Sequence, residues 1–131
     1  MSQENVEQTH RAVDALNGRD LEAYLMLMDE DVEAVSRIAA VEGGLHGHDG
    51  IRTWWDNWFG SFPDYTIEVV GMRDIEDITL ATIKAVGHGA GSALPFEDNA
   101  WLAGRWRDGR CTWWQVFPAE AEALKAVGLS K

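Results

Sequence analysis

The spacing of the apolar residues changes near the middle of the chain, and this change limits how the chain can fold. Up to Phe62, apolar side chains recur every three or four positions, most clearly between Ile51 and Phe62. That spacing is typical of amphipathic helices. From Tyr65 onward the spacing becomes two, with β-branched residues between turn formers, which is typical of strands. The two halves together predict an α+β fold.

The first half of the chain predicts two helices that form a hairpin, then a strand and a third helix. Helix stop and start signals mark the boundaries, because Asn-Gly favours a helix end and Asp favours a helix cap. The expected elements are a helix over 6–16, a helix that begins at Asp20, a strand from Val32 to Ile38, and a helix from Asp49 to Gly60.

The second half predicts a run of antiparallel strands and a short last helix. The strands are Tyr65–Arg73, Ile78–Gly87, Phe96–Arg107 and Arg110–Phe117. Asp108-Gly109 suits a type I′ hairpin turn. Pro118 is expected to open the C-terminal helix, because proline favours the first helical position. The arrangement predicts one sheet with the helices segregated to one face.

Composition limits the partners and the compartment. The 131 residues fit a single domain, 1–131, because hydrophobic cores are typically built from roughly 100–150 residues. The net charge of −11 argues against binding to nucleic acid or to an anionic membrane surface. Cys111 is the lone cysteine, no apolar stretch could span a bilayer, and the first residues lack a secretory signal. We therefore expect a cytoplasmic protein.

The last predicted strand is apolar on both faces. Alternation places Trp113, Gln115 and Phe117 on one face, and Trp114 and Val116 on the other. One face can pack on the helices. The other would be a large exposed apolar patch, and such patches usually mark an interface. We therefore expect a homodimer through the sheet.

The chain contains ALNGRDL (15–21), GHDGIRTWW (47–55) and WRDGR (106–110), and it ends with AEALKAVGL (121–129). In this order and spacing the segments resemble the SnoaL-like branch of the nuclear transport factor 2-like superfamily. The resemblance implies a cone-shaped α+β barrel, in which a curved antiparallel sheet wraps around three helices and leaves a deep apolar pocket. Relatives include polyketide cyclases, ketosteroid isomerase, scytalone dehydratase and limonene epoxide hydrolase, so the fold does not fix the function.

The resemblance also implies where acid/base residues would stand. The catalytic tyrosine of ketosteroid isomerase falls near Ala12 and its base falls near Ser36. The aspartate that the isomerase and the cyclases place on the penultimate strand falls at Leu102. A leucine cannot transfer a proton, so these positions argue against the usual acid/base mechanism.

Two other titratable residues are candidates for acid/base groups at positions that differ from those of the relatives. Asp98 shares strand parity with Leu102 and would point toward the pocket, although a solvated or paired position at the sheet margin also explains it. His88 shares parity with Lys84, so it would point inward only if a bulge occurs near Gly87. A histidine on the rim is the simpler interpretation.

We expect neither a metal nor a cofactor. The segment from His46 to Asp49 has metal-ligating residue types, but no second cluster completes a site, and capping of the third helix explains His48 and Asp49. The glycines of GHGAG lack the phosphate-binding pattern. Cys111, in the middle of a strand, is expected to be a packed apolar residue.

Aromatic residues give the better indication of a pocket. The resemblance places Trp54 and Trp55 where ketosteroid isomerase carries aromatic pocket residues, although core packing explains any one ring. Together the rings predict a cavity for a small hydrophobic or aromatic molecule, with Tyr24, Arg37 or Asp98 as orienting polar groups. The predicted lining is Tyr24, Arg37, Trp54, Trp55, Leu102, Trp114 and Val116.

Three functions remain open from the sequence. The first is binding of a small apolar molecule. The second is a cofactor-independent isomerase, cyclase, lyase or hydrolase that uses Asp98 or His88. The third is a dimeric interaction module whose pocket is filled by tryptophan side chains.

Overall fold

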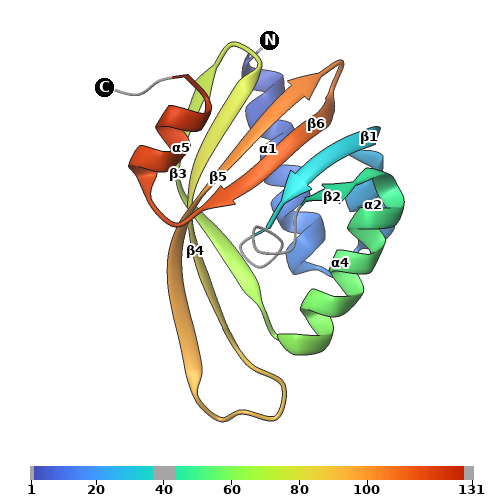
Figure 1. The fold of residues 1–131 in the computed structure, drawn as a ribbon, viewed down its shortest axis with the longest axis vertical. Coiled ribbons are helices and arrows are strands. Elements are labelled where there is room, and N and C mark those ends of the chain that lie inside the picture. The colour runs from blue at the N-terminus through green and yellow to red at the C-terminus, as the bar shows by residue number, and fades with distance from the viewer. Residues whose placement is uncertain (1, 37–43, 129–131) are drawn as a thin grey trace.

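The computed structural model describes residues 2–36 and 44–128 and shows an α+β fold in the predicted element order (Figure 1). None of the described helices is both long enough and apolar enough to cross a bilayer. The helices are α1 (Ser2–Asn17), α2 (Leu21–Met26), α4 (Gly47–Ser61) and α5 (Glu120–Ala126). The strands are β1 (Met28–Val35), β2 (Leu45–His46), β3 (Thr66–Ile75), β4 (Ile78–His88), β5 (Pro95–Arg107) and β6 (Arg110–Phe117).

The strands form one curved, open sheet in the order β2-β1-β6-β5-β4-β3. The pairs from β3 to β6 are antiparallel, as predicted. However, β1 runs parallel to β6, with Glu33 opposite Trp113, so the expectation of a wholly antiparallel sheet is wrong at this pair. The short helix α2 returns the chain to the end of the sheet where β6 begins, and Met28 pairs with Cys111 there.

Helices cover both faces of the sheet. The helices α1, α2 and α4 pack on one face, here called the inner face, whereas α5 packs on the opposite, outer face (Figure 1). The expectation that all helices lie on one face is therefore wrong for α5. The small side chain of Ala123 allows α5 to lie close against Leu80, Ala103 and Phe117.

Several predicted boundaries shift by a few residues. Because α2 ends at Met26, Met28 begins β1 rather than ending a helix, and the strand starts before the expected Val32. The predicted end of that strand, Ile38, lies outside the described residues. The helix α4 begins at Gly47 rather than at Asp49, and α5 begins at Glu120 rather than at Pro118. The type I′ turn is confirmed by positive φ angles of 53° and 80° at Asp108 and Gly109.

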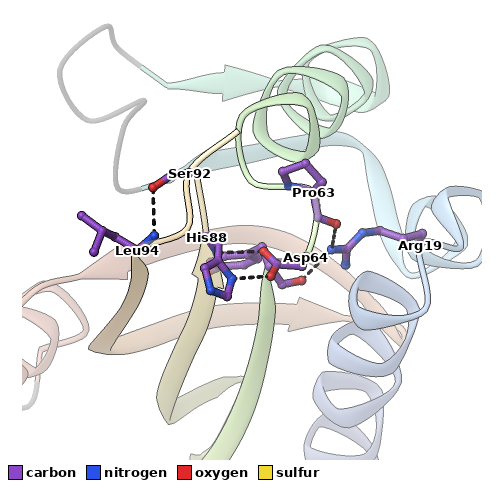
Figure 2. A network of polar contacts seen from close by, with 7 residues as sticks. Arg19, Pro63, Asp64, His88, Ser92 and Leu94 are labelled. Atoms are coloured by element: carbon purple, nitrogen blue, oxygen red, sulfur yellow. Dashed lines mark hydrogen bonds and ion pairs between the residues drawn. The ribbon is translucent and has the colours of Figure 1, made fainter. Parts of the chain in front are cut away.

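Side chains of the first helix hairpin hold it against the start of β3. The Asn17 amide donates to the Ile67 carbonyl at 2.8 Å and accepts from the Ile67 N–H at 3.0 Å. The Arg19 guanidinium donates to the carbonyls of Pro63 at 2.8 Å and Tyr65 at 2.7 Å (Figure 2). These bonds fix α1 relative to the connection between α4 and β3, and so fix the inner face.

Candidate functional site

A small cavity lies on the inner face, among α1, α2 and the strands β4 to β6. Its volume is about 30 Å³. The lining residues are Thr9, Ala12, Tyr24, Met28, Thr79, Leu102, Gly104, Trp106, Cys111 and Trp114. The fold thus brings the predicted site residues Tyr24, Leu102 and Trp114 to one place.

Aromatic rings from α2, α4 and β6 pack together beside this cavity. The ring centroids of Tyr24 and Trp55 lie 5.2 Å apart, and those of Trp54 and Trp114 lie 5.3 Å apart at an interplanar angle of 60°. Tyr24 also lies 6.3 Å from Trp54, so the four rings form one cluster. Tilted and edge-to-face contacts of this kind are the favoured ones between aromatic rings. Ring against ring packing leaves little free volume, which accounts for the small cavity.

The described wall of the cavity carries no side chain that is charged at neutral pH. Burial raises the pKa of the Tyr24 hydroxyl far above its ordinary value, and burial raises the pKa of the Cys111 thiol to about 12. Both groups therefore stay protonated. Leu102 lies on this wall at the position where the resemblance implies an aspartate. This wall therefore offers no group that could exchange a proton with a substrate in the physiological pH range.

A chain of buried hydrogen bonds borders one side of the cavity. The Trp106 indole N–H donates to the Thr79 hydroxyl at 2.9 Å, and the hydroxyls of Thr79 and Thr9 lie 3.0 Å apart. The Thr9 hydroxyl donates to the Asn5 carbonyl at 2.9 Å, so the proton between the two threonines comes from Thr79. Sequence reasoning missed these residues. The available signal was a polar threonine at an inward position of β4.

Three other indole nitrogens are buried without a hydrogen-bond partner in the described part of the chain. The Nε1 atoms of Trp54, Trp58 and Trp114 have no acceptor within residues 2–36 and 44–128, whereas the Nε1 of Trp106 donates to Thr79. Most buried polar groups in folded proteins are paired, so each exception calls for a physical explanation. Trp114 is 4% exposed and lines the cavity, and its ring contacts that of Trp54. The aromatic cluster next to the cavity therefore contains two buried indole N–H groups without an acceptor among the described residues.

His88 lies outside the cavity lining, at the rim of the sheet. Continuous pairing of β4 with β5 keeps it on the same side of β4 as Lys84, with no bulge near Gly87. Its Nδ1 lies 2.7 Å from Asp64 Oδ2, and its backbone N–H donates to Asp64 Oδ1 at 2.8 Å (Figure 2). These bonds lower the pKa of Asp64. The pair borders an open groove of about 310 Å³ that also includes Phe96.

Asp98 shares the inner face of β5 with Leu102 but lies four residues away along the strand. At roughly 3.4 Å per residue the two Cα atoms are about 14 Å apart. Asp98 is half-buried and is not on the cavity lining. The structure therefore does not bring Asp98 and His88 together with Leu102.

A sequence model of the SnoaL-like domain matches residues 9–114, which is most of the chain. The chain belongs to the SnoaL-like family. No curated protein matches its sequence.

Solved structures share the fold of this SnoaL-like chain. A hypothetical protein with a ketosteroid isomerase-like fold from Catenulispora acidiphila, in complex with trimethylamine, is 20% identical, with coverage of 94% and 93% of the two chains and a TM-score of 0.78. An NTF2-like protein of unknown function from Burkholderia pseudomallei is 14% identical, with coverage of 93% and 95% and a TM-score of 0.81. IdmH from Streptomyces antibioticus, assigned as a polyketide cyclase, is 21% identical, with coverage of 94% and 97% and a TM-score of 0.75.

The remaining predicted residues of the SnoaL-like chain fall in several places. Val116 pairs with Leu102 across β5 and β6 and packs against the inner core, whereas Arg37 lies outside the described residues. His46 precedes α4 without a side-chain capping bond, and its Nδ1 contacts Glu33. The His48 Nε2 lies 3.0 Å from the Met28 carbonyl, so capping does not explain His48. Within the described ranges, no cluster of three metal-ligating side chains occurs.

Proposed function

We propose that this SnoaL-like protein binds a small, neutral and mostly apolar molecule in the cavity beside Leu102. The observation that carries the proposal is the cavity wall, which combines the rings of Tyr24, Trp106 and Trp114 with Leu102 and bears no charged side chain among the described residues. Apolar walls with a few polar groups are the usual features of small-molecule sites. A leucine at the position of the family aspartate suits binding rather than proton transfer.

The volume of the cavity limits the size of the ligand. A water-sized sphere needs roughly 10–15 Å³, so a cavity of about 30 Å³ holds about two or three such spheres, and the ligand is a compact molecule of only a few non-hydrogen atoms. The relative from Catenulispora acidiphila is in complex with trimethylamine, which is likewise a compact molecule. A flat aromatic ligand would have to displace the packed rings of Trp54 or Trp114.

Filling the cavity tests the proposal. Leu102→Phe adds ring volume on the cavity wall, and Leu94→Phe makes the same change at an exposed position of the β4–β5 connection. We would titrate acetone, isobutene and trimethylammonium chloride into ¹⁵N-labelled protein and follow the backbone and indole resonances around the cavity. Such small ligands gain at most about 1.5 kcal/mol per atom, so the titrations extend into the millimolar range.

The proposal expects saturable shifts with acetone or isobutene in the wild type and in Leu94→Phe, and the loss of these shifts in Leu102→Phe. If neither acetone nor isobutene gives saturable shifts in the wild type, or if trimethylammonium alone does, the proposal of a neutral ligand is overturned. Equal binding by Leu102→Phe and the wild type would overturn it as well.

A second candidate function is proton transfer by His88. The hydrogen bond between His88 and Asp64 favours this function. A carboxylate that accepts from Nδ1 fixes the imidazole orientation and leaves Nε2 as the basic atom, which is a common arrangement for a general base. Such an enzyme would be a cofactor-independent isomerase, cyclase, lyase or hydrolase that works at the groove beside Phe96.

Exchange of the α-protons of acetone for deuterium in D₂O tests this second candidate. The base removes an α-proton, and the enolate then takes a deuteron from the solvent. We expect His88→Gln to abolish protein-dependent exchange, and His10→Gln, an exposed histidine on α1, to preserve it. Equal exchange rates for the wild type and His88→Gln would remove this candidate.

A further inference from the structure

The Tyr24 side chain brings a polar group to the wall of the cavity. Tyr24 lies on α2, lines the cavity and is 6% exposed. Within residues 2–36 and 44–128, its hydroxyl has no hydrogen-bond partner. Leaving a buried hydroxyl unpaired costs folding free energy, because its hydrogen bonds to water are lost on folding and are not replaced. An unpaired hydroxyl at a cavity is therefore a group that a bound molecule could pair.

The Tyr24 oxygen is reachable from the cavity, unlike the unpartnered indole nitrogens of the same region. Those three nitrogens each have less than 1 Å² of accessible area, whereas the Tyr24 oxygen, which also lacks a partner among the described residues, keeps more. Burial, and after it the Cys111 thiol, raise the pKa of Tyr24, so the hydroxyl lies close enough to Cys111 for the two groups to interact electrostatically. Because Tyr24 and Cys111 both line the cavity, the accessible side of the hydroxyl faces it.

Other side-chain donors on the cavity wall already have acceptors. The hydroxyl proton of Thr79 goes to Thr9, and that of Thr9 goes to a backbone carbonyl of α1. The Trp106 indole N–H donates to Thr79, and the Cys111 thiol donates to a backbone carbonyl at 3.2 Å. Among the described residues, the Tyr24 hydroxyl is thus the accessible donor that the protein leaves free at this cavity.

The hydroxyl can donate because it stays protonated. Burial is the largest cause of the raised pKa of Tyr24, so the neutral phenol persists throughout the physiological pH range. The described wall also carries no side chain that is charged at neutral pH. Burial of an unpaired charge is unfavourable, so the partner that suits the hydroxyl best is a neutral acceptor.

We infer that Tyr24 is the specificity-determining residue of this cavity, and that the bound molecule is a small neutral compound whose oxygen accepts a hydrogen bond from the Tyr24 hydroxyl. The inference rests on the proposed binding function and adds the group that recognises the ligand. An acceptor oxygen on a compact apolar molecule pairs the hydroxyl, whereas a hydrocarbon of the same shape leaves it unpaired. Tyr24 therefore distinguishes these two classes of ligand.

Two probes of nearly the same size test this distinction. Acetone has an acceptor oxygen, and isobutene has a methylene group in its place. Water hydrates acetone more strongly than isobutene, so the informative quantity is the ratio of the two dissociation constants, compared between proteins. Tyr24→Phe removes the hydroxyl and keeps the ring, and Tyr65→Phe makes the same change outside the cavity lining. We expect the affinity for acetone relative to isobutene to fall about twofold to tenfold in Tyr24→Phe and to stay unchanged in Tyr65→Phe.

The hydrogen bond can also be observed in the unmodified protein. Labelling with ¹³C at the tyrosine Cζ gives two resonances, because the chain contains two tyrosines. The spectrum of Tyr65→Phe identifies the resonance of Tyr24. We expect saturation with acetone to move the Tyr24 Cζ resonance further downfield than saturation with isobutene does, because donation of the hydroxyl proton draws the phenol toward its ionised form. This measurement decides the question even if Tyr24→Phe does not fold.

An unchanged ratio in Tyr24→Phe, or equal shifts of the Tyr24 Cζ resonance with the two probes, would overturn the inference and leave the binding function intact. Binding of isobutene without binding of acetone would overturn it in the same way, as would equal losses of the ratio in Tyr24→Phe and Tyr65→Phe. If neither probe binds to the wild type, the binding function itself is overturned, so the two failures are distinguishable.

Discussion

Thr79 lies at the middle of the buried polar chain beside the cavity. Thr79→Val removes its bonds to Trp106 and Thr9 and leaves the Trp106 donor unpaired. Such a change costs about 1–3 kcal/mol, and we expect the free energy of unfolding to fall by that amount. Urea unfolding measures it, with Thr82→Val on the outer face as the control, expected within about 0.5 kcal/mol of the wild type. Equal free energies of unfolding for Thr79→Val and Thr82→Val would contradict a stabilising role of the buried hydrogen bonds.

An aspartate restored at position 102 would report whether the cavity is dry. Burial raises the pKa of a carboxyl group above its ordinary value, because the charged form loses its hydration. Leu102→Asp should therefore be most stable at low pH and should lose stability as the pH rises above that ordinary value. We expect the difference in unfolding free energy from Leu102→Asn to grow between pH 4 and pH 8. A difference that stays constant across this range would indicate a solvated site.

Some of the site residues can be predicted from the sequence and others cannot, for physical reasons. Leu102 and Trp114 could be placed because the Asp108-Gly109 turn fixes the register of the last two strands. The bond between Thr9 and Thr79 joins residues 70 positions apart, and helical spacing cannot show which strand faces Thr9. Whether a particular indole N–H finds an acceptor also depends on tertiary packing rather than on residue spacing.

At the scale of elements, Asp64 holds the β4–β5 hairpin against the connection after α4. Bonds from His88 lower its pKa below the ordinary value of 3.8, so the ionised form stabilises the fold. That stability is present above the ordinary pKa and is lost as the pH falls through the lower folded value. Thermal unfolding between pH 2 and pH 6 should show a smaller loss of stability with acid for Asp64→Asn than for the wild type. Asp74→Asn, at an exposed site on β3, should follow the wild type, and a wild-type profile for Asp64→Asn would contradict the role of the pair.

The element order is predictable because the apolar spacing is strong and the turn residues are distinctive. The wrong predictions concern features that depend on which other element a strand or helix contacts. Alternation along β1 is the same for a parallel and an antiparallel neighbour, so the parallel pairing with β6 could not be inferred. The short strand β2 has too few residues to show a period. The apolar residues of α5 show that it packs on a sheet, but its own spacing does not identify which face.

At the scale of the whole molecule, we propose that the outer face mediates a homodimer. The helix α5 covers Phe117 and its neighbours, whereas Val86, on the same face of β4 as Leu80, is 38% exposed. Sedimentation at micromolar concentration should give twice the 14.6 kDa mass of one chain. Val86→Lys should weaken the dimer, and Met26→Lys, at an exposed position on α2, should not. A monomer at that concentration would contradict the proposal.

The binding cavity can be tested with an apolar atom that needs no hydrogen bond. Xenon enters apolar cavities of proteins and is located by its anomalous scattering in crystals. We predict a xenon site on the inner face within van der Waals contact of Leu102 and Trp114. Xenon sites elsewhere in the crystal with none at this position would contradict a cavity that admits small apolar molecules.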